Sequence, residues 1–146
     1  MGSQHRNPCR YVLIAGDEYD LPAIRRLLGG LPEDTYGQVF VEILTERVQE
    51  SLPAPERVAV TWLVRSRRAS RIPLLPFADR GEPLAAALAG WATEWLAGAD
   101  EQSAEHPLMW IGVAESAHVA AVQDLLLGPV YDQVRSLDDA LDDRFG

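Results

Sequence analysis

The stretch of the sequence best suited to chemistry runs from residue 11 to residue 24 and reads YVLIAGDEYDLPAI. An apolar run ends at Gly16, and three carboxylates follow at Asp17, Glu18 and Asp20. We expect a strand, a tight turn and a helix, a corner that in open α/β proteins binds phosphate at the helix N-terminus. Carboxylates repel phosphate, but they cap helices, at about 0.3–1 kcal/mol each. The corner therefore predicts either a helix cap or a crevice whose ligand keeps its phosphates elsewhere.

A run of arginines after the third expected strand is the second candidate site. Arg65, Arg67, Arg68 and Arg71 form a positive island in a chain whose formal net charge is −9. The planar fork of arginine suits bidentate contacts to phosphate, which indicates a nucleotide phosphate as the ligand. A solvated loop whose arginines pair with neighbouring acids is the alternative.

Several catalytic classes are excluded by what the sequence lacks. The dinucleotide fingerprint and the P-loop both need further glycines around Gly16, and the P-loop needs a lysine. The chain has no lysine, which also excludes a phospho-acceptor receiver domain and any Schiff-base or amine nucleophile. No G-x-S-x-G elbow occurs, and Cys9 lies in a polar N-terminal stretch. The three histidines share no metal-ligand spacing, so we expect them on the surface and expect no metal site.

The bulk properties describe an ordinary folded domain. With 146 residues, of which 47% are hydrophobic, the chain is long enough for one domain with a full core. Its acidic balance argues against nonspecific binding to nucleic acid or to an anionic membrane surface. No apolar run approaches the roughly 20 residues of a membrane span, and a single cysteine cannot form an internal disulfide. We therefore expect a cytoplasmic protein that binds neither nucleic acid nor membrane.

Strand-like and helical segments alternate along the chain. Apolar runs predict strands over 11–16, 37–44, 57–65 and 108–114, and helical spacing predicts helices over 21–28, 82–97 and 116–127. This order predicts an α/β fold with an open parallel sheet of four to five strands, helices on both faces and the strand order 3-2-1-4. The functional crevice of such a sheet lies at the carboxyl ends of its first and fourth strands.

The same pattern predicts one domain over residues 11–127, between a flexible N-terminal arm (1–10) and an acidic C-terminal tail (128–146). The helical positions expected in the core are Leu21, Ile24, Leu27, Leu28, Leu84, Leu88, Trp91 and Trp95. Trp62 and Trp110 lie in expected strands and are expected to pack in the core as well.

The first corner carries a family resemblance. YVLIAGDEYDLPAI closely resembles the L-x-G-D-E-T-A-L-P-A-I corner that opens the C-terminal domain of siderophore-interacting proteins, which are flavin-dependent ferric-siderophore reductases of the ferredoxin-reductase superfamily. The likeness continues in order through GQVFVEI, VTWLVR and MWIGVAES. It covers about residues 11–127, and it implies a fold like the NAD(P)-binding half of a ferredoxin reductase.

In that family the resembled domain binds NADPH or NADH, and a preceding β-barrel domain binds FAD. Hydride passes from nicotinamide to flavin, and electrons pass on to ferric iron. The resemblance implies that Gly16, Asp17 and Glu18 line the crevice where nicotinamide meets flavin. It also implies that Arg65 approaches the adenosine phosphate and that Glu115 matches the glutamate of the family's A-G-E-A-S corner.

The choice between NADH and NADPH stays open at the level of sequence. Glu42, near the end of the second expected strand, could hold a ribose hydroxyl and would then favour NADH. The arginines after the third strand would favour the 2′-phosphate of NADPH. The two features therefore indicate opposite preferences.

Three departures from the family pattern lead to two hypotheses. Tyr19 replaces the family's threonine, Ala114 replaces a glycine, and the expected flavin barrel is missing. The first hypothesis is a stand-alone NAD(P)H-binding component of a ferric-siderophore reductase system for iron acquisition, with FAD supplied by a partner. Its partners would be a flavin-binding protein or a ferric siderophore, and a homodimer stays open. The alternative is a non-catalytic domain of the same fold that acts as a protein-interaction or regulatory module.

Overall fold

The computed structural model describes residues 11–67, 78–98, 108–113 and 116–124, and these contain the elements of the predicted domain. The predicted arm (1–10), the tail (128–146) and Glu115 lie outside the described residues. In chain order the elements are β1 (Tyr11–Asp17), the 3₁₀ turn η2 (Glu18–Asp20), α1 (Leu21–Gly29), β2 (Tyr36–Ile43), η3 (Glu46–Val48), β3 (Arg57–Val64), η4 (Arg65–Arg67), α2 (Glu82–Gly98), β4 (Leu108–Ile111) and α3 (Ala117–Val122).

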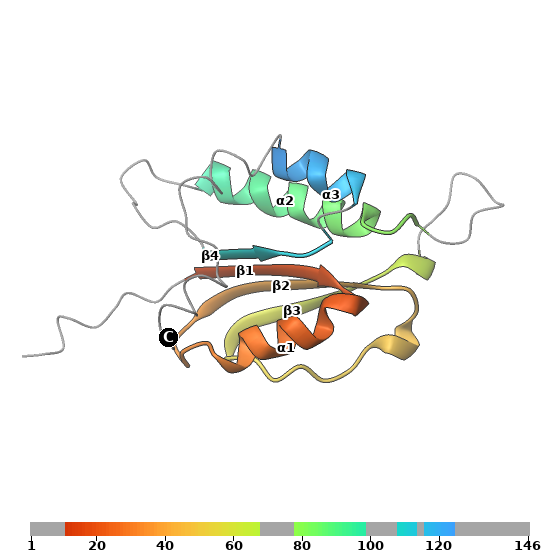
Figure 1. Cartoon of the computed structure of the whole chain (residues 1–146). Coiled ribbons are helices and arrows are strands. Elements are labelled where there is room, and N and C mark those ends of the chain that lie inside the picture. Colours follow the sequence, from red (N-terminus) through yellow and green to blue (C-terminus); the bar gives the residue numbers. More distant parts are fainter. Residues whose placement is uncertain (1–10, 68–77, 99–107, 114–115, 125–146) are drawn as a thin grey trace, which may run out of the picture.

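The four strands form one parallel sheet in the order β3-β2-β1-β4. Figure 1 shows α1 on one face of this sheet and α2 with α3 on the other, so the molecule has three layers. The predicted fold class, strand order and helix-covered faces are therefore confirmed. All strands run in the same direction. The carboxyl ends of β1, β2 and β3 therefore lie at the same edge of the sheet, which we call the carboxyl edge. None of the helices among the described residues has the length and hydropathy needed to cross a membrane.

One half of the core lies between the sheet and α1. β1 is buried along nearly its whole length, which explains its unbroken apolar sequence, because a central parallel strand has no solvent side. The apolar stripe of α1 consists of the predicted positions Leu21, Ile24, Leu27 and Leu28. These side chains pack with Val12, Ile14, Val39, Val41, Ile43 and Val58 of the strands.

The other half of the core lies between the sheet, α2 and α3. It contains Leu13, Ala15, Leu84, Leu88, Trp91, Met109 and Val119. The predicted core positions of α2 are thus confirmed, with Trp95 partly buried and stacked on Trp91 at a centroid distance of 5.4 Å. Trp62 and Trp110 are also partly buried, and both pack on the α1 side of the sheet.

β4 is shorter than the sequence predicts. The N–H of Gly112 still donates to the carbonyl of Ala15 at 2.8 Å, but the strand itself ends at Ile111. Val113 then adopts a φ of 56°, an uncommon conformation for a β-branched residue that cannot continue a strand. The following α3 starts at Ala117, because the Oγ of Ser116 accepts the N–H of Val119 and caps the helix.

Candidate functional site

The acidic corner after β1 is held by hydrogen bonds between its own residues. The Oδ1 of Asp17 accepts the N–H of Tyr19 at 3.0 Å, and the N–H of Asp17 donates to Oδ2 of Asp20 at 3.0 Å. This reciprocal arrangement is a capping box, which satisfies N–H groups at the start of η2. Capping therefore accounts for two of the three carboxylates, as one of the sequence-based interpretations predicted.

The side chain of Asp20 lies between the ends of β1 and β4. A Cβ on Gly16 would come within 2.8 Å of the Asp20 Cβ, and a Cβ on Gly112 would come within 2.4 Å of its Oδ2. Both distances are far below van der Waals contact, so the two strand ends must be glycine while this carboxylate sits between them. The place where a phosphate would approach the strand ends is thus occupied by a negative charge of the protein itself.

Asp17 also joins the corner to the segment before α2. Asp17 is 3% exposed, and its Oδ2 accepts a hydrogen bond from Nε of Arg80 at 2.6 Å. A buried carboxylate needs such a partner, because an unpaired charge inside a protein is costly. The guanidinium of Arg80 lies 5.4 Å from the centre of the Tyr19 ring, within the range of a cation–π contact. Sequence reasoning missed Arg80, whose only signal was its place two residues before a helix.

Glu18 links two neighbouring strands at the carboxyl edge. Its Oε1 accepts the N–H of Leu44, directly after β2, at 3.0 Å. Leu44 in turn accepts the N–H of Ser66 through its carbonyl at 3.2 Å. The segments that follow β1, β2 and β3 are therefore tied together by hydrogen bonds.

Glu42 is a buried carboxylate that caps α2. The residue is 1% exposed. Its Oε2 accepts the N–H of Gly81 at 2.7 Å, and its Oε1 accepts the N–H of Leu84 at 3.0 Å. Gly81 can take its place beneath this carboxylate because its φ is +89°, which glycine adopts without strain. Glu42 thus holds the N-terminus of α2 against β2, and its predicted contact with a ribose hydroxyl stays a prediction.

The groups around Glu42 shift the pKa of its carboxyl in opposite directions. Burial raises the pKa of its carboxyl above the ordinary value of 4.5, and the negative charge of Asp17 acts in the same direction. The two backbone N–H groups and the charge of Arg65 lower it, but burial dominates. Asp17 and Glu42 are register partners on adjacent strands, so the acidic corner and this buried carboxylate belong to one charged cluster.

Arg65 follows β3 and is held against the start of the α2 segment. Its Nε donates to the carbonyl of Ala78 at 2.9 Å, and its own carbonyl accepts the N–H of Ala78 at 3.1 Å. The side chains of Arg67, Arg68 and Arg71 lie outside the described residues.

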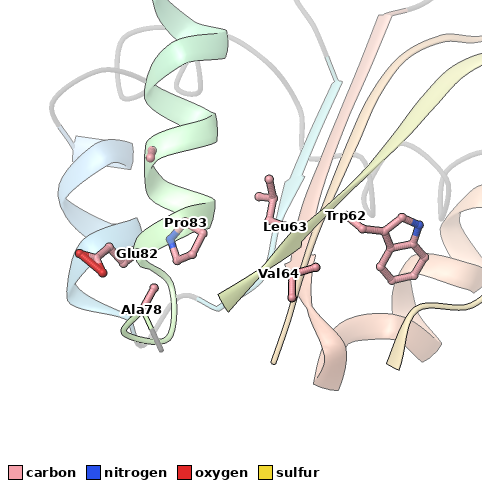
Figure 2. A pocket seen from close by; sticks show the side chains of 7 residues that line it. Trp62, Leu63, Val64, Ala78, Glu82 and Pro83 are labelled. Atoms are coloured by element: carbon pink, nitrogen blue, oxygen red, sulfur yellow. The ribbon is translucent and has the colours of Figure 1, made fainter. Parts of the chain in front are cut away.

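A hollow of about 480 Å³ opens between β3 and the first turns of α2. Two of its lining residues adjoin Arg65: Val64 precedes it in the chain, and the carbonyl of Ala78 accepts its Nε–H. Its lining is mostly apolar and comprises Trp62, Leu63, Val64, Ala78, Glu82, Pro83 and Ala86. Figure 2 shows Leu63 directed from the strand towards α2 and Pro83, while Trp62 lies on the opposite side of the strand. Ligand pockets commonly enclose about 300–1,000 Å³ with apolar walls and a few polar groups, so this hollow can hold a ring system.

The structure brings together five of the six predicted site residues. Gly16 and Asp17 end β1, and Glu18 follows them in η2. Glu42 lies beside Asp17 on β2, and Arg65 follows β3. Backbone N–H groups or Arg80 engage the four site carboxylates, Asp17, Glu18, Asp20 and Glu42. The described residues contain no group of three potential metal ligands. The arrangement is suited to binding and orienting a ligand.

The fold and the site together define a class of protein, the open parallel α/β proteins. In open parallel α/β sheets, ligands commonly bind at the carboxyl ends of the strands, which is where the hollow and the charged corner of this chain lie. Two solved structures share the fold: a siderophore utilization protein from T. fusca (TM-score 0.53, 23% identity, 90% of this chain and 42% of that one) and the siderophore-interacting protein of Acinetobacter baumannii (TM-score 0.52, 16% identity, 91% and 44%). The chain thus shares its fold with siderophore-interacting proteins, as the sequence predicts.

The family follows from the sequence. The model of the family described as "Siderophore-interacting protein" matches residues 9–133, and the chain belongs to this family. An uncharacterized protein of Mycobacterium tuberculosis (strain H37Rv) is 38% identical over 86 residues, which is 59% of this chain and 29% of that protein. The ferric vibriobactin reductase ViuB of Vibrio cholerae is 32% identical over 89 residues, which is 57% of this chain and 33% of ViuB. The matched part is therefore about a third of these curated relatives.

Proposed function

We propose that this chain is the NAD(P)H-binding component of a ferric-siderophore reductase system for iron acquisition in the cytoplasm. NADPH or NADH binds at the carboxyl edge of the sheet, and FAD is supplied by a partner protein that carries a flavin-binding barrel. Hydride passes to that flavin, and electrons pass from the flavin to a ferric siderophore.

The observation that carries the proposal is the hollow beside Arg65, at the carboxyl edge of a sheet whose family is established. Its apolar walls suit an adenine ring, and the neighbouring guanidinium suits the phosphates that an adenine nucleotide carries. The lining of the hollow also supports the proposal, because it contains none of the three carboxylates of the acidic corner.

The remaining predicted residues take roles around this hollow. In the proposal Gly16, Asp17 and Glu18 line the end of the crevice where the nicotinamide meets the flavin. Glu42 orders the N-terminus of α2, which lines the hollow, and retains its proposed contact with a ribose hydroxyl. Glu115 retains its proposed place at the crevice after β4.

Calorimetric titration of the full chain with NADPH and with NADH, each with and without FAD, tests the proposal. We expect micromolar binding of at least one nucleotide. Arg65→Ala should weaken that binding by about tenfold, because charge-assisted contacts to phosphate are among the stronger hydrogen bonds.

Arg57→Ala is the matched control. Arg57 is the first residue of β3, at the edge of the sheet opposite Arg65, and it stacks on Tyr36. Arg57→Ala therefore changes the net charge by the same amount as Arg65→Ala but leaves the hollow intact. Nucleotide affinity should stay at the wild-type value. No heat with either nucleotide at millimolar concentration would contradict the proposal and favour the alternative, a non-catalytic interaction module.

A further inference from the structure

Tyr19 is the most exposed large hydrophobic side chain among the described residues. It is 77% exposed, whereas Leu44, the other exposed large hydrophobic residue of that part of the chain, is 37% exposed. The two lie at the ends of adjacent strands, since Glu18, next to Tyr19, binds the N–H of Leu44. A single exposed aromatic residue is ordinary on a protein surface, so its exposure alone indicates nothing.

The ring of Tyr19 differs from an ordinary surface ring because it is held in place. Its backbone N–H is bonded to Oδ1 of Asp17 inside the capping box. The guanidinium of Arg80 lies over its ring at 5.4 Å, and this guanidinium is itself held by the buried Asp17 at 2.6 Å. One carboxylate thus fixes both the backbone of the tyrosine and the cation beside its ring.

A fixed and exposed aromatic ring is a preorganised surface for stacking. Ordering a side chain normally opposes binding, and a ring that is already ordered avoids most of that cost. Planar heteroaromatic rings stack on tyrosine in an offset arrangement and gain free energy beyond the area they bury. Tyr19 stands at the end of β1, next to the glycine and the carboxylates that the proposed function places beside the redox ring.

We propose that Tyr19 is a stacking platform for the planar, electron-poor ring of a redox cofactor, and specifically for the isoalloxazine ring of a flavin. The inference rests on the proposed function, which already brings a flavin from outside the chain to this corner. Tyr19 is 77% exposed, so its ring is available to a cofactor carried by another molecule. A nicotinamide bound within the crevice would instead be covered by this chain. Tyr19 also stands where the resembled family has a threonine, so the platform would be a feature of this chain.

The test uses free FMN and FAD as probes, with flavin fluorescence and anisotropy followed as the full chain is added. Tyr19→Ala and Tyr19→Thr should weaken flavin binding by roughly fivefold to tenfold, the loss expected for one aromatic stacking contact. Tyr19→Phe should keep the wild-type affinity, because the ring and its cation–π neighbour remain. Near-ultraviolet circular dichroism of each variant serves as the control for folding.

Calorimetry with NADPH and NADH on the same variants separates this inference from the proposed function. The expected result is unchanged nucleotide affinity in Tyr19→Ala alongside weakened flavin binding. Equal flavin affinity of Tyr19→Ala and the wild type would overturn the inference, and so would a wild-type chain that binds no flavin. Nucleotide binding in either case would leave the proposed function standing. If Tyr19→Ala weakens only the nicotinamide nucleotide, the ring that stacks is the nicotinamide, and the flavin assignment is wrong.

Discussion

At the scale of single residues, Glu42 shows how one carboxylate can serve structure inside a predicted binding site. The sequence indicates only an acid near the end of an apolar strand, which is the usual signal for a ribose contact. The structure adds two backbone N–H groups, that of Gly81 directly before α2 and that of Leu84 in its first turn, 39 and 42 residues further along the chain. No pattern within β2 could reveal these partners, because they come from a segment that only the fold brings near.

A pH titration of stability checks the buried state of Glu42. Burial raises the pKa of this carboxyl above 4.5, so its contribution to the free energy of unfolding is full below about pH 4.5 and declines as the pH rises through the raised pKa. Urea unfolding from pH 4 to 8 should therefore show the wild type losing stability relative to Glu42→Gln as the pH increases. Glu56→Gln, at an exposed site, should run parallel to the wild type. A constant difference between wild type and Glu42→Gln would contradict the prediction.

At the scale of elements, strands and helices were predictable where one local pattern decides them. The unbroken apolar run of β1 and the helical spacing in α1 match their burial in the structure. β4 was predicted too long, because an apolar sequence does not show that Val113 adopts a φ of 56°. The first residue of α2 was predictable from the sequence. The way in which this helix packs on β2 and α3 was not, because it depends on the contacts of Gly81 with Glu42 and Ser116.

Gly81 supports a matched pair of stability predictions. Its φ is +89°, and a Cβ there would lie 2.0 Å from Oγ of Ser116, the N-cap of α3. Gly81→Ala should therefore lower the free energy of unfolding by about 2–4 kcal/mol, through backbone strain and a displaced cap. Gly90→Ala, in the exposed interior of α2 with nothing within 4 Å of its Cβ, should raise it by about 0.5–1 kcal/mol. Urea unfolding measures both, and equal effects would contradict the assigned role of Gly81.

At the scale of the whole molecule, the sequence predicted the sheet order and the edge at which the site residues meet. Parallel strands with helical crossovers leave few arrangements, so the order of the strands and the edge formed by their carboxyl ends could be predicted without coordinates. The pairing of Asp17 with Arg80 could not be predicted from the sequence, because the two residues are 63 positions apart in the chain. The hollow between β3 and α2 could not be predicted either, because its size depends on the distance between the helix and the strand.

The proposed function also predicts a dependence on added flavin. No side chain of this chain carries electrons from a hydride donor to iron, so transfer needs a cofactor that accepts two electrons and passes them on singly. With NADPH and ferric citrate, the protein should not accelerate NADPH oxidation above the protein-free rate. With FAD or FMN added it should do so, and Arg65→Ala should reduce the acceleration. Acceleration without flavin, followed by NADPH absorbance, would show that the assigned route is wrong.

The carboxylate of Asp20, seated between Gly16 and Gly112, has a consequence for how this sequence can diverge. Neither glycine can acquire a side chain while the aspartate keeps its place, since the contacts would be 2.8 Å and 2.4 Å. A relative with alanine at either strand end should therefore carry a smaller residue at position 20, or a displaced turn. The three positions should thus covary among descendants of this chain, although they lie as much as 96 residues apart in the numbering.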